Sequence, residues 1–232
     1  MIKTIALDYG RVLAIPRSGD WFFPRHTWRI LGPTDYLRFL FAGHKKKAAR
    51  NKAGKFLNDN HLILTEQEEF DQFYKFYLTI LGACGIKNLE QSCQTLAQFT
   101  VYDPRKVKFF RDVAPGIASL KKQHRVVIIS DTWPSLRSVL QCYGVAVDDL
   151  ILSNNYGHQK GDDGKLFHSA IEHHGIVPKE TLFVDDSVRN LDYAKALGFH
   201  TAQMLRYPWA KRSGHHVVRN MRQLKKLAGE II

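Results

Sequence analysis

The sequence predicts an α/β fold: a Rossmann-like parallel sheet with an inserted α-helical cap. Short apolar runs alternate with helical segments in both terminal parts of the chain, as in successive βα units. A long helix-like stretch interrupts this alternation after the first strand. Several of the apolar runs also end directly in an acidic or hydroxyl residue. Because ligands bind at the carboxyl edge of open α/β sheets, we expect a functional site there.

The composition is that of an ordinary globular protein. The chain has 232 residues, of which 44% are hydrophobic and 24% charged, enough for one core and an accessory lobe. No apolar stretch approaches the ~20 residues that span a bilayer, and the chain begins with a strand, so we expect no membrane partner and no signal peptide. Cys84, Cys93 and Cys142 have neither metal-ligand spacing nor a disulfide framework, which favours a reducing, cytoplasmic setting.

The first predicted strand is Ile2 to Leu7, and it ends at Asp8, which is followed by Tyr9, Gly10 and Arg11. An Asp after a strand is often only a helix N-cap. Whether Asp8 is a helix cap or a site residue therefore depends on which side chains the other strands place at the same edge of the sheet.

The helical insertion contains three segments with apolar residues at helical spacing: 35–41, 66–81 and 88–99. Thr65 is the predicted N-cap of the second segment, with Glu68 at the distance of a capping box. The βα alternation resumes near Pro115. We therefore expect a core domain formed by residues 1–16 and 101–232 and a cap domain formed by residues 17–100.

The second half of the core repeats the pattern of the first strand. A helix over 116–122 leads into a strand over 126–129, which ends in Ser130, Asp131 and Thr132. A possible strand over 150–152 precedes a loop that carries Lys160. The strands thus deliver to one edge the hydroxyl and the cation that phosphoryl transfer requires beside a carboxylate nucleophile.

The last of these strands, 181–184, ends in Asp185 and Asp186 and opens the helical segment that begins at Ser187. Two adjacent carboxylates in an apolar setting repel each other and stay partly protonated unless a cation neutralises them. Carboxylate oxygens are ligands that suit Mg²⁺. The acidic pair therefore predicts a magnesium site.

The order and spacing of these four sites resemble the haloacid dehalogenase superfamily. The resemblance spans residues 1 to about 205 and is best over 2–13 and 125–203. The segment TLFVDDSVRNLDYAKALGFHTAQML is similar to the fourth motif of the subfamily that carries a small helical cap. In that family, an insertion at this point of the chain closes over the active site and selects the substrate.

The resemblance implies a role for each residue. Asp8 is the nucleophile that forms an aspartyl phosphate, and its other oxygen binds Mg²⁺ together with the carbonyl of Gly10. Ser130 donates a hydrogen bond to the transferring phosphoryl group, and Lys160 neutralises the nucleophile and the phosphate. Asp131 and Thr132 line the pocket.

For the acidic pair, the resemblance implies that Asp186 binds the metal directly and Asp185 through a water, although the sequence itself does not decide the order. Asn190, one helical turn later, is expected to face the same site and to hold a metal-bound water.

Two departures from the family pattern matter. The usual Lys-Pro-Asp of the third motif is replaced by a looser loop after Lys160, with one inserted residue, which makes Lys165 a rival for the same role. The second Asp of the first motif, which protonates the leaving group, is replaced by Gly10. General acid catalysis contributes ~10²–10⁴-fold, so we expect a slow enzyme or a good leaving group, such as an anomeric or acyl phosphate. Arg11 either contacts phosphate or points to solvent.

The formal charge of +12 is unevenly distributed. Residues 21–60 carry nine Lys or Arg against two Asp, and residues 205–232 carry seven against one Glu. A basic cap attracts anionic substrates. Nucleic-acid binding is an alternative, because aromatic residues lie near the basic run, but such aromatics more often pack a cap core.

Three functions remain open. The first, which we favour, is a Mg²⁺-dependent phosphatase that acts on a small phosphorylated metabolite. The second is a dehalogenase, which needs no metal and whose family members generally lack the acidic pair. The third is a catalytically silent binding or regulatory protein, which Gly10 and the altered loop after Lys160 keep possible. No pattern in the sequence names the substrate or the oligomeric state.

Overall fold

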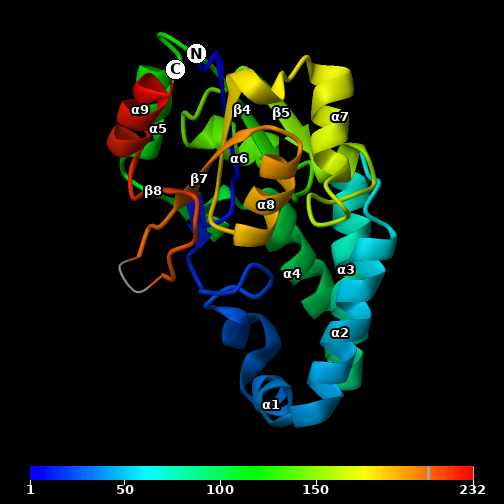
Figure 1. Ribbon diagram of the computed structural model, residues 1–232. Helices are drawn as coiled ribbons and strands as arrows, with labels where there is room; N and C mark the ends of the chain where they lie inside the picture. The colour runs from blue at the N-terminus through cyan, green and yellow to red at the C-terminus, as the bar shows by residue number, and fades with distance from the viewer. Residues whose placement is uncertain (208–209, 232) are drawn as a thin grey trace. The chain divides into compact units, whose positions relative to one another are not determined.

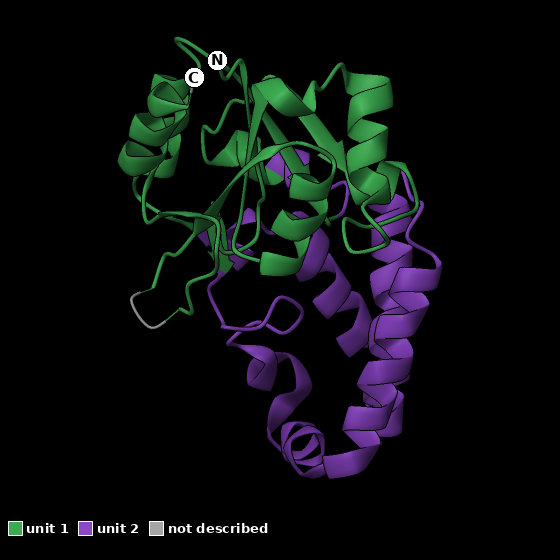
Figure 2. Cartoon of the chain, viewed as in Figure 1, with its two compact units in different colours: residues 1–15, 109–132, 139–232 green, residues 16–108, 133–138 purple. Residues whose placement is uncertain are grey.

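The computed structural model describes residues 1–207 and 210–231 (Figure 1). Residues 208, 209 and 232 of the predicted core segment lie outside the described residues. The chain divides into two compact units (Figure 2). Unit 1 comprises Met1–Ile15, Phe109–Thr132 and Val139–Ile232; unit 2 comprises Pro16–Lys108 and Trp133–Ser138.

Unit 1 is built on a six-stranded sheet in the order β5-β4-β1-β6-β7-β8. Every neighbouring pair is parallel, and β1 lies in the interior of the sheet between β4 and β6. The strands are β1 (Thr4–Leu7), β4 (Arg125–Ser130), β5 (Asp149–Leu152), β6 (Thr181–Asp185), β7 (His200–Met204) and β8 (His216–Val218). This sheet, with helices packed on it, confirms the predicted α/β Rossmann-like fold.

Helices cover both faces of the sheet, as parallel sheets require. They are α5 (Val113–Leu120), α6 (Leu136–Cys142), α7 (Lys165–His174), α8 (Val188–Ala196) and α9 (Met221–Glu230). The helices α7 and α8 share one core with the sheet, in which Phe167 packs edge-on against Phe183 of β6. The helices α5 and α9 pack against each other. Short 3₁₀ turns at Ser153–Asn155 and Pro178–Glu180 complete the connections.

The predicted strands are all present, with ends shifted by one or two residues. The larger shift is in α5, which begins at Val113 and not at Gly116. Pro115 therefore lies in the first turn of this helix, where the missing N–H is tolerated because it would have no partner within the helix.

Unit 2 is helical. Its helices are α1 (Thr27–Phe41), α2 (Gly43–Asp59), α3 (Glu66–Ala83) and α4 (Leu89–Tyr102), followed by a 3₁₀ turn at Pro104–Lys106. The core of the unit is rich in aromatic residues, including Phe73, Phe76 and Tyr77 of α3, all nearly inaccessible to solvent. Of the aromatic residues near the basic run, Phe23 is buried in this core and Phe22 packs against it, whereas Trp21 and Trp28 are exposed.

Local signals explain the helix ends in unit 2. The predicted capping box of α3 is confirmed: Thr65 accepts from the Glu68 amide, and the Glu68 carboxylate accepts from the Thr65 amide. The predicted 35–41 helix is the second half of α1, which is broken at Gly32, where φ is 72°, just before Pro33. The basic helix α2 was not predicted, because it carries few apolar residues.

Two short strands, β2 (Ala14–Pro16) and β3 (Val107–Phe109), pair where the chain passes from unit 1 into unit 2 and back. Among the described residues, no helix is long and apolar enough to span a bilayer. The three cysteines are free thiols. The cytoplasmic location stays a prediction.

Candidate active site

Three adjacent strands deliver polar side chains to one edge of the sheet. Leu7 of β1 pairs in register with Ile128 of β4 and with Val184 of β6, so Asp8 lies level with Asp185, and Ser130 follows one residue further along β4. The strand residues behind these side chains are almost completely buried, which fixes the register by hydrophobic packing. The structure therefore brings Asp8, Ser130 and the acidic pair together at this edge of the sheet.

Lys160 lies between the carboxylates of two strands. Its Nζ is 2.5 Å from Asp8 Oδ1 and 2.8 Å from Asp185 Oδ2, and the side chain is 1% exposed. The Ser130 hydroxyl donates to the same Asp8 oxygen at 2.9 Å. Both donors engage Oδ1 of Asp8, so Oδ2 is not used by either of them.

The two acids of the pair have different surroundings. Asp185 is buried and accepts hydrogen bonds from Lys160, from the backbone amide of Ser187 (2.8 Å) and from Asn190 Nδ2 (3.0 Å). The side chain of Asp186 is 30% exposed, and its one ion pair is a 3.6 Å approach of Arg11. Asn190 thus faces the site, as expected, but it binds Asp185.

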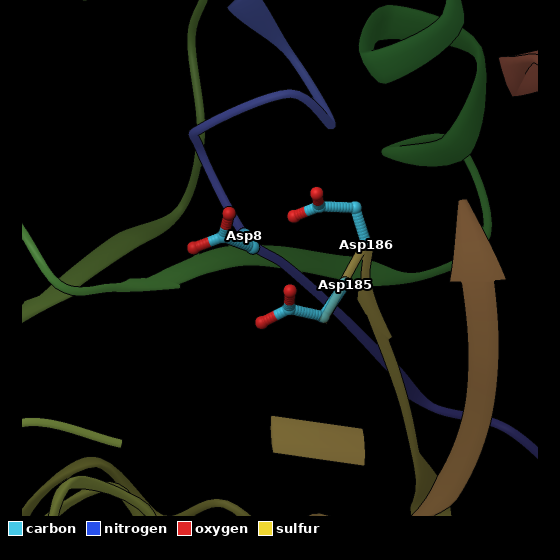
Figure 3. Close-up of side chains that lie close together, drawn as sticks. All are labelled: Asp8, Asp185 and Asp186. Atoms are coloured by element: carbon cyan, nitrogen blue, oxygen red, sulfur yellow. The ribbon is translucent and has the colours of Figure 1, made fainter. Parts of the chain in front are cut away.

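The side chains of Asp8, Asp185 and Asp186 lie next to one another and extend to the same side (Figure 3), and each offers a carboxylate oxygen within 4.8 Å of the other two. Only oxygen donors are present, which suits a hard divalent cation. Among the described residues, the cations paired with these three carboxylates are the buried Lys160 and the exposed Arg11, so one negative charge is left over when all three acids are ionised. The donor chemistry and the charge of the site therefore fit Mg²⁺.

The pKa values of the groups in the site reflect the same excess of negative charge. Burial, together with the nearby Asp185, raises the pKa of Asp8 to about 7 despite the contact with Lys160. Burial and Asp185 also raise the pKa of Asp186 to about 6. Burial opposes the charge on Lys160, but Asp185 and Asp8 outweigh it and raise the pKa of Lys160 above its usual value.

A tight turn follows Asp8. The amides of Leu13 and Ala14 both donate to the Tyr9 carbonyl, and the Arg11 amide donates to the Ala14 carbonyl at 2.7 Å. Arg11 has a φ of 59°, which is unusual for a residue with a side chain. Gly10 is not among the residues of positive φ, so the left-handed position of this turn is occupied by arginine.

The other two predicted pocket residues, Asp131 and Thr132, each take part in a hydrogen bond that involves a backbone amide. Asp131 Oδ1 accepts a hydrogen bond from the Lys160 amide at 2.9 Å, and the Thr132 amide donates to Ser153 Oγ at 2.9 Å. Burial raises the pKa of Asp131. The structure therefore adds an anchoring role for Asp131, which a lone Asp after a Ser does not signal in a sequence.

The loop after Lys160 accommodates the inserted residue in a compact turn. The Gly164 amide donates to the Lys160 carbonyl, and Asp162 accepts from the Gln159 amide. Lys165 begins α7 and is exposed, whereas Lys160 is buried among the carboxylates. Of the two lysines, the structure brings Lys160 to the acidic site.

No family model matches the chain. Among curated proteins, it is similar to D-ribitol-5-phosphate phosphatase from Bacteroides thetaiotaomicron, with 32% identity over 131 residues. The matched segment covers 52% of this chain and 60% of that relative, which is less than two thirds of the relative's length.

Solved structures of low sequence identity have the same fold. A 2-haloacid dehalogenase from Pseudomonas syringae pv. Tomato matches with a TM-score of 0.70 at 15% identity, over 99% of both chains. An L-2-haloacid dehalogenase from Xanthobacter autotrophicus matches with a TM-score of 0.68 at 16% identity, over the full length of both chains. A HAD phosphatase from Thermococcus onnurineus matches with a TM-score of 0.57 at 18% identity, over 98% of both chains. These solved structures show that the chain has the fold of the haloacid dehalogenase-like enzymes.

Proposed function

We propose that the protein is a Mg²⁺-dependent phosphatase that hydrolyses a small phosphorylated metabolite through an aspartyl-phosphate intermediate. The observation that supports this most is the cluster of Asp8, Asp185 and Asp186, whose carboxylate oxygens lie within 4.8 Å of one another beside Lys160. The 32% identity to a sugar-alcohol phosphatase agrees with a phosphorylated substrate.

In this proposal, Asp8, Asp186 and the Gly10 carbonyl would hold Mg²⁺ directly, and Asp185 would support the site from beside them. The metal would neutralise the phosphoryl oxygens and hold the phosphate in line with the nucleophile. Asp185 is already engaged by Lys160, Ser187 and Asn190, which favours Asp186 as the direct ligand.

The protein's own groups supply the rest of the reaction. Lys160 and Ser130 fix Asp8 through Oδ1, so the carboxylate is oriented before the substrate arrives. Asp8 attacks phosphorus, the bond between phosphorus and the ester oxygen breaks, and the leaving oxygen takes a proton from a solvent water, because Gly10 offers no acidic side chain. A second water then attacks the aspartyl phosphate at phosphorus. The bond between phosphorus and Asp8 breaks, one proton of this water returns to solvent, and inorganic phosphate leaves with Asp8 restored.

A dehalogenase is the competing proposal, because 2-haloacid dehalogenases share the fold. A likeness at 15–16% identity supports the fold alone. A halide leaving group needs no divalent cation, and such a reaction has no use for uncompensated carboxylates beside the nucleophile. The acidic cluster therefore favours the phosphatase.

The test is a substrate screen with Asp8→Asn as the blank. Sugar, polyol, nucleotide and acyl phosphates, with ribitol 5-phosphate included, are incubated with Mg²⁺, and phosphate release is measured. We expect turnover of at least one phosphate ester by the wild type and only background by Asp8→Asn, since the amide has no negative charge with which to attack. Turnover by Asp8→Asn with an unchanged melting temperature would show that Asp8 is not the nucleophile. Release of halide from 2-haloacids, with no phosphatase activity, would replace this proposal with the dehalogenase.

A further inference from the structure

A hollow in unit 1 is lined by residues of the edge strand β8 and of helix α9. These two elements lie next to each other in Figure 1. Its volume is about 360 Å³, within the range of small-ligand sites. The hollow is lined by nine residues, four of them with basic side chains: Arg212, His216, Val217, Val218, Arg219, Gln223, Lys226, Leu227 and Glu230.

The charges that line this hollow are unbalanced. Within the part of the chain that the structure describes, the guanidinium groups of Arg212 and Arg219 form no ion pair and no hydrogen bond. The one acidic lining residue, Glu230, lies 3.6 Å from Lys226. Among the described residues, two arginine side chains therefore line one hollow without an ion-pair partner, and guanidinium groups recognise phosphate through paired N–H donors.

The buried side chain of Gln203 forms hydrogen bonds to the residues on both sides of Arg212. Gln203 of β7 is 2% exposed, and its Oε1 accepts from both the amide and the hydroxyl of Ser213 at 2.9 Å. Its Nε2 donates to the Lys211 carbonyl at 3.2 Å. The residues on both sides of Arg212 are thus fixed by one buried amide, so the arginine extends from an ordered segment, which lowers the entropic cost of binding a ligand.

The Arg219 side of the hollow is also ordered. The Arg219 amide donates to Gln223 Oε1 at 2.8 Å, and its carbonyl accepts from Arg206 at 3.5 Å. Arg206 is itself buried and paired with Asp112. Both arginines therefore extend from backbone that is anchored to the core of unit 1.

We propose that the hollow between β8 and α9 is a second anion site, which binds a small phosphorylated ligand between Arg212 and Arg219. The site is distinct from the acidic cluster in chemistry as well as in place: it presents guanidinium groups, whereas the cluster presents carboxylates. Its ligand is recognised by the phosphoryl group, so inorganic pyrophosphate, a nucleotide and a sugar phosphate share the essential chemistry.

The probe is inorganic pyrophosphate, titrated into the intact protein by calorimetry in the presence of a chelator. Without a divalent cation, the three carboxylates of the acidic cluster repel the probe, so binding reports on the second site. We expect binding by the wild type and a loss of affinity of at least ~10-fold in the Arg212→Gln/Arg219→Gln variant. Parallel titrations with a nucleotide and with a sugar phosphate identify which source of the phosphoryl group binds best.

The matched control is Lys211→Gln/Arg222→Gln, which removes the same charge from the same two segments at exposed side chains outside the hollow. We expect its affinity to change by less than ~2-fold, because only the general field is weakened. Equal losses in the two variants, unchanged binding in Arg212→Gln/Arg219→Gln, or no binding by the wild type at millimolar pyrophosphate would each overturn the proposal. A single-stranded oligonucleotide that binds more tightly than pyrophosphate, and equally weakly to both variants, would identify an extended nucleic-acid surface in place of a small-ligand site.

Discussion

The turn after β1 holds two unusual residues beside the proposed nucleophile. Gly10 stands where the resembled family usually has the acid that protonates the leaving group, and Arg11 takes the left-handed conformation that glycine would accept more easily. Each residue gives a prediction that does not depend on the identity of the natural substrate.

The first prediction concerns Gly10. Without a carboxylate at this position, the rate should depend strongly on leaving-group pKa, with aryl phosphates faster than primary alkyl phosphates by a margin that approaches ~10²–10⁴. Because the φ of Gly10 is not positive, Gly10→Asp introduces no left-handed strain, and it should accelerate alkyl substrates selectively. The measurement is a leaving-group series on both proteins. A flat series in the wild type, with chemistry shown to be rate-limiting, would mean that another group already supplies the proton.

The second prediction concerns Arg11, whose side chain is 69% exposed and 3.6 Å from Asp186. Arg11→Gly and Arg11→Ala both remove the guanidinium, but only glycine relieves the backbone at φ 59°. We expect Arg11→Gly to be more stable than Arg11→Ala by about 1 kcal/mol in urea unfolding. If the guanidinium binds phosphate, KM for an aryl phosphate rises equally in both. An unchanged KM in both would show that Arg11 points to solvent.

Among the helices of unit 2, hydrogen bonds and an ion pair at the helix ends stabilise the packing. Asp35 of α1 is buried, forms an ion pair with Arg38 at 2.6 Å and accepts from the amides of Lys87 and Asn88 between α3 and α4. These hydrogen bonds lower the pKa of Asp35 below its usual 3.8, although burial opposes them. A single carboxylate thus joins three helices.

The third prediction follows from this shift. Because the folded protein lowers the pKa of Asp35, the carboxylate stabilises the fold fully above pH 3.8, and this stability is lost as the pH falls through the lower, folded value. Asp35→Asn should therefore lower the free energy of unfolding at pH 6 by about 1–3 kcal/mol, and the difference from the wild type should shrink toward pH 3. Urea unfolding across this range measures it, with the exposed Asp59→Asn as control. A difference that stays constant with pH would show that the ionised Asp35 carboxylate does not stabilise the fold.

Across the whole molecule, the sequence predicted the position of a candidate site residue where that residue directly follows a buried strand. The apolar runs before Asp8, Ser130 and Asp185 set both the strand and its register, so local pattern alone predicts their convergence. Thr65 and Glu68 likewise define a helix start through neighbours in sequence.

Contacts between distant segments were not predicted, because no local pattern encodes them. Asp131 holds the amide of Lys160 across 29 residues, and Gln203 holds the backbone around Ser213. The strand of Gln203 also contains His200 and Thr201, so the polarity of Gln203 did not by itself signal a buried partner. Residues 133–138 belong to unit 2 although they follow the core strand β4, which the predicted boundaries at 17–100 did not include.

The proposed metal site is tested most directly by the metal dependence of p-nitrophenyl phosphate hydrolysis. Initial rates are measured after exhaustive chelation, during Mg²⁺ titration, and with Asp186→Asn in place of the wild type. We predict that chelation abolishes turnover, that Mg²⁺ restores it with saturation, and that Asp186→Asn requires a much higher Mg²⁺ concentration or stays inactive while its fold survives. Undiminished hydrolysis in excess chelator would contradict a metal site at Asp8 and Asp186, and with it the phosphatase mechanism proposed for this protein.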